Sequence, residues 1–126
     1  MPAPVAPMPA PLRRTLILRL DIRISSVEQL FGGVDAAWIR RRVPATVADI
    51  EPEARAAGIG WPRTYSPVDQ VQEIDGGYRV TIAWAIDVPS QPGPVDIERW
   101  RYWLERRLRR TQHGDRIRAV RMTVQP

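Results

Sequence analysis

A β-hairpin signal at residues 68–88 constrains the fold of this chain more than any other feature of its sequence. Two β-prone stretches flank the Asp-Gly-Gly segment at 75–77, and an Asp-Gly pair in that setting is the strongest short hairpin signal. Within 78–88, apolar residues occupy every second position. This period of two predicts a strand with one face in a core. We therefore expect a sheet with at least one antiparallel pair of strands.

Two further strands and a helix are predicted around the hairpin. Residues 15–24 alternate with the same period, and residues 116–124 form a last strand. A helix is predicted from about residue 94 to His113-Gly114, with Gly114 as the residue that follows its last turn. The apolar positions of this helix have the three-four spacing of a buried face: Ile97, Trp100, Leu104 and Leu108.

The segment after the first strand predicts a helix in two pieces. A capping signal at residues 25–28 starts the first piece, whose apolar residues share one side: Val27, Leu30 and Phe31. The glycines at 32–33 interrupt it, and the second piece runs over 34–43. Pro44 is expected to end that piece, because proline disfavours helical geometry in the preceding residue. Residues 44–67 are then predicted as a long irregular connection.

The order strand, helix, connection, hairpin, helix, strand predicts an α+β fold of the ferredoxin-like, split β-α-β-β-α-β class. Its antiparallel-containing sheet would carry the helices on one face. A length of 126 residues with 44% hydrophobic residues suits one domain of this kind. We expect that domain at residues 15–126.

Residues 1–14 are predicted as an extended, proline-rich arm outside the domain. Proline occupies five of the first eleven positions, which removes backbone donors and favours a polyproline conformation. The segment lacks the basic start and continuous apolar stretch of a signal peptide. Because prolines lower the entropy that is lost on docking, we expect the arm to bind a neighbouring subunit. Its sizeable apolar anchors are Val5 and Met8.

Missing residue types exclude several kinds of chemistry. The chain has no cysteine, which excludes disulfides, Cys-ligated zinc, iron–sulfur clusters and thiol catalysis. Its single histidine, His113, excludes a multi-His metal site and is expected at a solvated helix end. No apolar run approaches the roughly 18–20 residues of a membrane span. We therefore expect no enzymatic activity, no cofactor, no metal, no small-molecule substrate and no membrane association.

The chain is arginine-rich, with a net charge of +5 and no lysine. A GC-rich genome explains the bias toward arginine, but the charge itself suits nucleic acid or an acidic protein surface. Ion pairs at helical spacing, such as Glu98–Arg101 and Glu105–Arg109, offset part of it. Arginine beside tryptophan is typical of protein interfaces and of single-strand stacking surfaces. The candidate contact residues are Arg40, Arg41, Arg42, Trp61, Trp103, Arg106 and Arg110.

Residues 78–108 resemble the late half of phage tail-terminator and neck proteins. The resemblance lies in the strand YRVTIAWAIDVP, a short loop and the tryptophan-bearing helix VDIERWRYWLERRL. Those proteins are small α+β subunits that form rings at the head–tail joint and have no active site. The resemblance implies a non-enzymatic assembly subunit of a virion tail or head–tail joint, assembled in the host cytoplasm. Its partners would be copies of itself and other particle subunits.

A second stretch resembles the winged helix-turn-helix of excisionase- and MerR-type DNA binders. It comprises SVEQLFGGVDAAWIRRRVPA and the later RTYSPVDQVQEI. The resemblance implies a recognition helix at 35–42, a wing exit at 63–69 and a helix at 68–74. The alternative function is therefore a basic, cytoplasmic nucleic-acid-binding module, either a winged helix or an RNA or DNA binder on a ferredoxin-like sheet.

Overall fold

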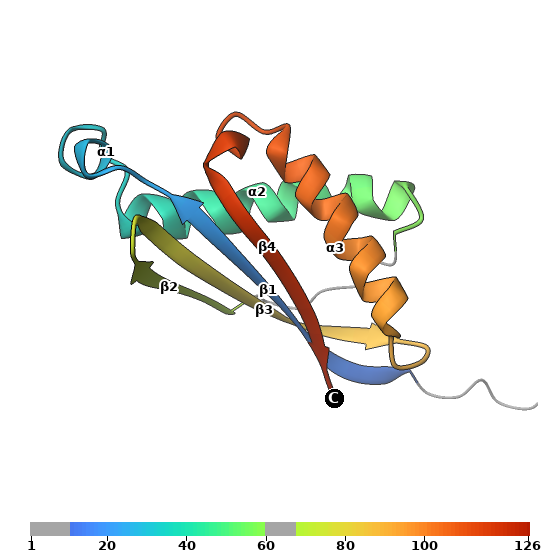
Figure 1. Ribbon diagram of the computed structural model, residues 1–126. Coiled ribbons are helices and arrows are strands. Elements are labelled where there is room, and N and C mark those ends of the chain that lie inside the picture. Colours follow the sequence, from blue (N-terminus) through green and yellow to red (C-terminus); the bar gives the residue numbers. More distant parts are fainter. Residues whose placement is uncertain (1–10, 60–67) are drawn as a thin grey trace, which may run out of the picture.

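The structure is a computed structural model, and it describes residues 11–59 and 68–126 of the chain. The predicted contact residues Val5, Met8 and Trp61, and nearly all of the predicted arm, lie outside the described residues. The elements follow one another as shown in Figure 1: β1 (Leu12–Arg23), α1 (Ser26–Phe31), α2 (Ala36–Ala56), β2 (Val68–Ile74), β3 (Gly77–Val88), α3 (Pro94–Arg109), the short 3₁₀ helix η1 (Gly114–Arg116) and β4 (Ile117–Gln125).

The four strands form one antiparallel sheet in the order β2-β3-β1-β4. β1 lies inside the sheet and pairs with β3 over its whole length, from Leu12 opposite Val88 to Arg23 opposite Gly77. On its other side β1 pairs with β4, whose register shifts beside Asp21 and Ile22. The α+β class and the membership of residues 15–24, 78–88 and 116–124 in one sheet are confirmed.

The β2–β3 hairpin forms at the predicted Asp-Gly-Gly turn. Gly76 has a φ of 78°, a conformation that glycine adopts without steric cost. Gly77 passes so close to β1 that a Cβ atom there would lie 1.8 Å from the Ile22 carbonyl oxygen. Gly76 is therefore needed for the conformation of the turn, and Gly77 is needed because β1 leaves no room for a side chain there.

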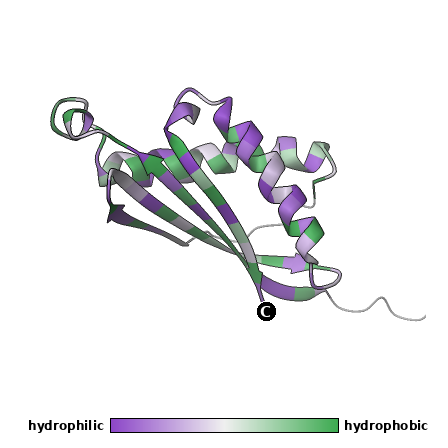
Figure 2. Ribbon diagram, viewed as in Figure 1, coloured by the Kyte–Doolittle hydropathy of each residue, from purple (hydrophilic) through white to green (hydrophobic). Residues whose placement is uncertain are grey.

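The core lies between one face of the sheet and the helices α2 and α3, which cover that face together (Figure 1). Along β1 and β3 the hydropathy alternates, as the bands in Figure 2 show, so that every second side chain enters the core. The apolar side chains of the three predicted strands enter this core, and Leu18, Leu20, Val80, Ile82, Trp84 and Val120 are all buried. The largest fully buried side chains are Leu16, Leu18, Leu20, Ile39, Val47, Val80, Ile82, Ile86 and Leu104.

Helix α2 is longer than the sequence predicts, because it continues through Pro44 and Pro52 to Ala56. The prediction that Pro44 ends the helix is wrong, and so is an irregular connection that begins at residue 44. An interior proline costs a helix about 3 kcal/mol. The apolar stripe of α2 continues on both sides of Pro44 and packs on the sheet, which outweighs that cost: Ile39, Val43, Val47, Ile50 and Ala54.

Helix α3 agrees closely with its prediction. Pro94 is its first residue, and the predicted stripe residues Trp100, Leu104 and Leu108 are buried. The predicted ion pairs form, with 2.6 Å between Arg101 and Glu98 and 2.9 Å between Arg109 and Glu105. The helix ends at Arg109, however, and Gly114 begins η1 instead of following the last turn of α3.

Candidate functional site

Helix α1 presents three large apolar side chains to solvent. Val27, Leu30 and Phe31 are between 66% and 84% exposed, and their spacing places them on one side of the helix. We call these three residues the α1 apolar patch. The helical spacing of these residues predicts that they share one side, but it does not predict a contact surface. A cluster of exposed apolar side chains of this kind marks a protein or membrane contact site.

Local hydrogen bonds and one long-range ion pair hold α1 in place. The Ser25 hydroxyl accepts from the Glu28 amide at 3.2 Å, and the Glu28 carboxylate accepts from the Ser25 amide at 3.4 Å. This reciprocal capping box is the one that residues 25–28 predict. The Glu28 carboxylate also forms an ion pair with Arg116, which lies 88 residues later in the sequence. The α1 apolar patch is therefore attached to the domain at a defined orientation.

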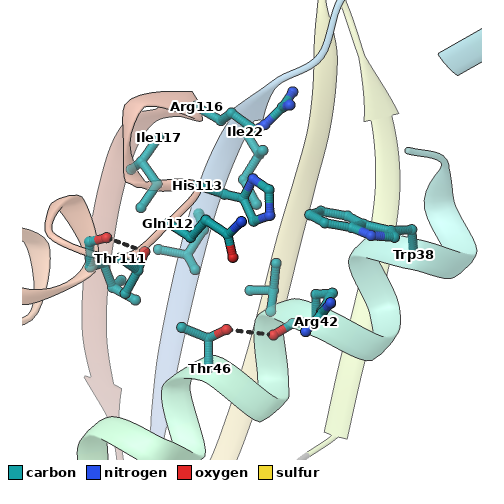
Figure 3. Close-up of a pocket in the computed structure, with 12 residues that line it drawn as sticks. Ile22, Trp38, Arg42, Thr46, Thr111, Gln112, His113, Arg116 and Ile117 are labelled. Atoms are coloured by element: carbon teal, nitrogen blue, oxygen red, sulfur yellow. Dashed lines mark hydrogen bonds between the residues drawn. The ribbon is translucent and has the colours of Figure 1, made fainter. Parts of the chain in front are cut away.

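A pocket of about 130 Å³ lies beside α2, at the turn between α3 and β4 (Figure 3). We call it the α2–turn pocket. Its apolar lining comes from β1, α2, α3 and β4: Leu20, Ile22, Val43, Leu108 and Ile117. Its other lining residues are aromatic, polar or charged: Trp38, Arg42, Thr46, Thr111, Gln112, His113 and Arg116. The pocket thus combines an apolar interior with a cationic rim.

Two aromatic side chains form one side of the α2–turn pocket. Trp38 and His113 make an edge-to-face contact, with ring centroids 5.1 Å apart and planes at 83°. The Asp35 carboxylate caps α2 by accepting from the Trp38 amide at 3.0 Å, which fixes the first turn that carries the indole. His113 is thus half-buried against an aromatic ring, whereas the sequence analysis expected it at a solvated helix end.

The hydroxyl groups in the pocket donate to helix carbonyls. Thr46 Oγ1 donates to the Arg42 carbonyl at 2.8 Å, and Thr111 Oγ1 donates to the Leu108 carbonyl at 2.5 Å. Among the described residues, no group of three or more histidines or carboxylates is placed to hold a metal ion. The pocket therefore offers shape, apolar surface and positive charge.

A second hollow of about 320 Å³, the α3 groove, lies between α3 and the end of α2. It brings together the predicted contact residues Trp103, Arg106 and Arg110. The Arg106 guanidinium lies 5.7 Å from the centre of the Tyr102 ring, within cation–π range. The remaining lining residues, Glu53 and Arg107, form a two-bond ion pair, and hydrogen bonding from Arg107 holds the pKa of the Glu53 carboxyl below its usual value.

The predicted arginine triplet on α2 does not join this groove. Arg40 and Arg41 are exposed, and Arg42 lines the α2–turn pocket. The structure therefore divides the predicted contact residues between two places, the α3 groove and α2. Thr46, Thr111 and Gln112 are pocket residues that the sequence does not predict, because no local pattern shows that α2 and the α3–β4 turn come together.

The face of the sheet opposite the helices carries short and charged side chains. Across its middle, Arg79 donates two hydrogen bonds to the Asp21 carboxylate, at 2.8 and 3.1 Å. These bonds hold the pKa of the Asp21 carboxyl below its usual value. Arg19 and Arg121 lie opposite each other on neighbouring strands of the same face. No aromatic side chain belongs to this face in the described part of β1, β3 and β4.

Comparisons with protein-family models, with curated proteins and with solved structures find no match to this chain. Of the described helices, none is long and apolar enough to cross a membrane.

Proposed function

We propose that this protein is a non-enzymatic assembly subunit that binds copies of itself and other subunits of a larger particle. The particle class that we propose is a virion tail or head–tail joint, as the resemblance to tail-terminator and neck proteins implies. The observation that carries the proposal is the exposed α1 apolar patch, which belongs to a helix at one end of the molecule (Figure 1).

The energetics of the α1 apolar patch favour a protein partner. Covering apolar surface is worth about 25 cal/mol per Å², and large apolar side chains near the centre of an interface contribute most of its affinity. The capping box and the Glu28–Arg116 ion pair order the helix before any partner binds. Less entropy is then lost on association, which is the usual benefit of a preorganised contact surface.

The surroundings of His113 support a function without catalysis. A general base needs a neighbour whose proton it can take, and a nucleophile needs such a base within hydrogen-bond reach. The two threonine hydroxyls near His113 instead donate to the carbonyls of Arg42 and Leu108. The imidazole itself packs on the ring of Trp38.

The sheet topology supports assigning the fold to the ferredoxin-like class. The element order is the split β-α-β-β-α-β order once α1 and α2 are counted as one helical crossover. Every neighbouring pair in the sheet is antiparallel, and the first strand lies between the third and the fourth. No described helix covers the sheet face opposite α2 and α3, which is a further surface on which a second subunit can pack.

The alternative function is nucleic-acid binding, and the α3 groove is the observation that favours it. Arg106 and Arg110 lie there beside Trp103, and neither arginine forms an ion pair among the described residues. The winged-helix form of this alternative needs a helix at 68–74, but these residues form β2, because the Asp-Gly turn pairs them with β3. The sheet form needs aromatic side chains on which bases stack, and the described strands place none on the face opposite the helices.

Sedimentation velocity separates the two functions. The wild type should self-associate, and the triple variant Val27→Ser, Leu30→Ser, Phe31→Ser should be monomeric with an unchanged circular dichroism spectrum. Association through apolar contacts should change little between 50 and 500 mM salt. A wild type that stays monomeric would contradict the assembly function.

The same conditions test the alternative with a labelled single-stranded oligonucleotide. Binding that falls steeply with salt would support a nucleic-acid function, because each phosphate contact releases counterions. The double variant Arg106→Gln, Arg110→Gln should then reduce the salt dependence by about two contacts.

A further inference from the structure

We infer that the α2–turn pocket is the acceptor for Phe31 of a second copy of this chain. The inference rests on the proposed assembly function and names the two surfaces that meet. One copy contributes the α1 apolar patch, and the next copy contributes the pocket beside α2. Within a single chain Phe31 does not enter the pocket. Its side chain is 84% exposed, and it is not among the residues that line the pocket.

The size of the pocket fits one aromatic ring. Its volume is about 130 Å³. An apolar cavity of about 150 Å³ in another protein binds benzene, so a phenyl group is close to the largest group that such a space accepts. Phe31 is also the most exposed of the large apolar side chains in the described part of the chain. A bulkier double-ring side chain would exceed the pocket, and a smaller aliphatic one would leave part of it unfilled.

The chemistry of the lining also fits a phenyl ring. Leu20, Ile22 and Leu108 provide an apolar interior, and the Trp38 indole offers an aromatic partner. Aromatic pairs in edge-to-face or offset geometry contribute beyond the area that they bury. The guanidinium of Arg42 at the rim can lie over the face of an inserted ring, as Arg106 already does over Tyr102.

The charges of the two surfaces are complementary. Residues 25–35, which contain α1, include two acidic residues, Glu28 and Asp35, and no basic residue. At the pocket rim Arg116 is already paired with Glu28 of its own chain, so Asp35 of one copy and Arg42 of the next are the charges left to meet. This pattern favours approach of the α1 end of one copy to the pocket of another and disfavours contact between two pockets.

The structure also disfavours insertion of Phe31 into the pocket of its own chain. Glu28 is joined to Arg116 at the rim, and Val34, three residues after Phe31, is buried in the core. The α1 helix is thus attached on both sides of Phe31 in a position that leaves the ring exposed. Because donor and acceptor are different surfaces, one copy can engage two neighbours, which extends assembly beyond a dimer.

Two variants remove the two surfaces separately. Phe31→Ser removes the inserted ring, and Thr46→Phe fills the pocket from α2. Gln112→Trp, at an exposed position on the α3–β4 turn, is a second pocket variant in case Thr46→Phe perturbs folding. Val95→Ser is the matched control for Phe31→Ser, because Val95 is 82% exposed and lies at the start of α3.

Each single variant, measured by sedimentation velocity, should associate at least about 30-fold more weakly than the wild type, the effect of losing one interface hot spot. The Val95→Ser control should associate as the wild type does. An equimolar mixture of Phe31→Ser and Thr46→Phe should form a 1:1 complex, because the mixture retains one intact ring and one open pocket. Such complementation is not expected if the variants act through misfolding.

Three results would overturn the inference. Wild-type association of Phe31→Ser would exclude Phe31 as the inserted group while leaving the assembly function intact. Failure of the mixture to form a complex, with both variants folded, would exclude the pocket as its acceptor. A wild type that remains monomeric would overturn the inference together with the proposed function.

Discussion

Helices α1 and α3 each carry apolar residues three or four positions apart on one side, yet they differ in what covers those residues. In α3 the stripe of Trp100, Leu104 and Leu108 is buried against the sheet. In α1 the equivalent side chains project into solvent, because this six-residue helix extends beyond the end of the sheet (Figure 1). Apolar residues at helical spacing therefore predict a helix face that is buried, but they do not show whether the same chain or another chain buries it.

The two faces of the sheet also differ in whether the helices of this chain cover them. The face toward α2 and α3 is filled with large apolar side chains, and the opposite face carries mainly charged and short side chains, with Ile17 as an exception. Removing a group from a surface that the chain covers itself should therefore destabilise the monomer. Removing one from an uncovered surface should affect association and leave the monomer nearly unchanged.

Leu104→Ala should have the largest effect on the monomer. Leu104 is fully buried in the middle of the α3 stripe, so truncation leaves a cavity. Such substitutions lower the free energy of unfolding by about 2–5 kcal/mol. Urea denaturation followed by circular dichroism measures the change. A loss below about 1 kcal/mol would mean that α3 packs on the sheet less closely than described.

Pro44→Ala should stabilise the monomer by about 1–2 kcal/mol. Alanine restores an amide hydrogen-bond donor within α2, and the greater freedom of the unfolded chain offsets part of the gain. Pro89→Ala, at an exposed position after β3, is the control and should change the free energy of unfolding by less than about 0.5 kcal/mol. If Pro44→Ala is destabilising, α2 does not continue through Pro44 in solution.

Asp21→Asn should cost about 1 kcal/mol at pH 7, since it breaks the two-bond pair with Arg79 on the uncovered face. Because Arg79 lowers the pKa of the Asp21 carboxyl, this contribution is present above the ordinary pKa of aspartate and is lost as the pH falls through the lowered value. Urea denaturation of both proteins from pH 7 to pH 2 should show the difference shrinking below about pH 4. A difference that persists unchanged at pH 2 would contradict this assignment.

Leu30→Ala should have the smallest effect on the monomer and a clear effect on assembly. Leu30 is exposed in α1, so its truncation should change the free energy of unfolding by less than about 0.5 kcal/mol. Self-association should weaken about tenfold, as expected for a contributing interface side chain. A monomer destabilised as strongly as in Leu104→Ala would mean that the chain covers α1 itself.

The parts of the fold that were predicted correctly depend on local signals. The Asp-Gly-Gly turn, the Ser25–Glu28 capping box and the proline at the start of α3 each fix a boundary through contacts within a few residues. The course of α2 through Pro44 was missed, because only the sheet beneath the helix shows that the apolar stripe continues.

The candidate contact surfaces were predicted only where their residues lie close together in the sequence. The grouping of Trp103, Arg106 and Arg110 follows from their spacing on one helix. The α2–turn pocket joins residues from elements far apart in the sequence, such as Trp38 and His113, and no local pattern brings them together. The exposure of α1 depends on where the sheet ends, which the spacing of Val27, Leu30 and Phe31 does not reveal.

The most direct test of the central claim, that another subunit covers α1, is photo-crosslinking from position 31. Phe31 is replaced by the photoreactive analogue p-azidophenylalanine, which keeps a single ring, and the same replacement at Val95 serves as the control. Irradiation of the first protein should yield covalent dimers joined between position 31 and residues of the α2–turn pocket, and the control should yield few dimers. Equal yields from the two positions, or a protein that stays monomeric after irradiation, would contradict the central claim.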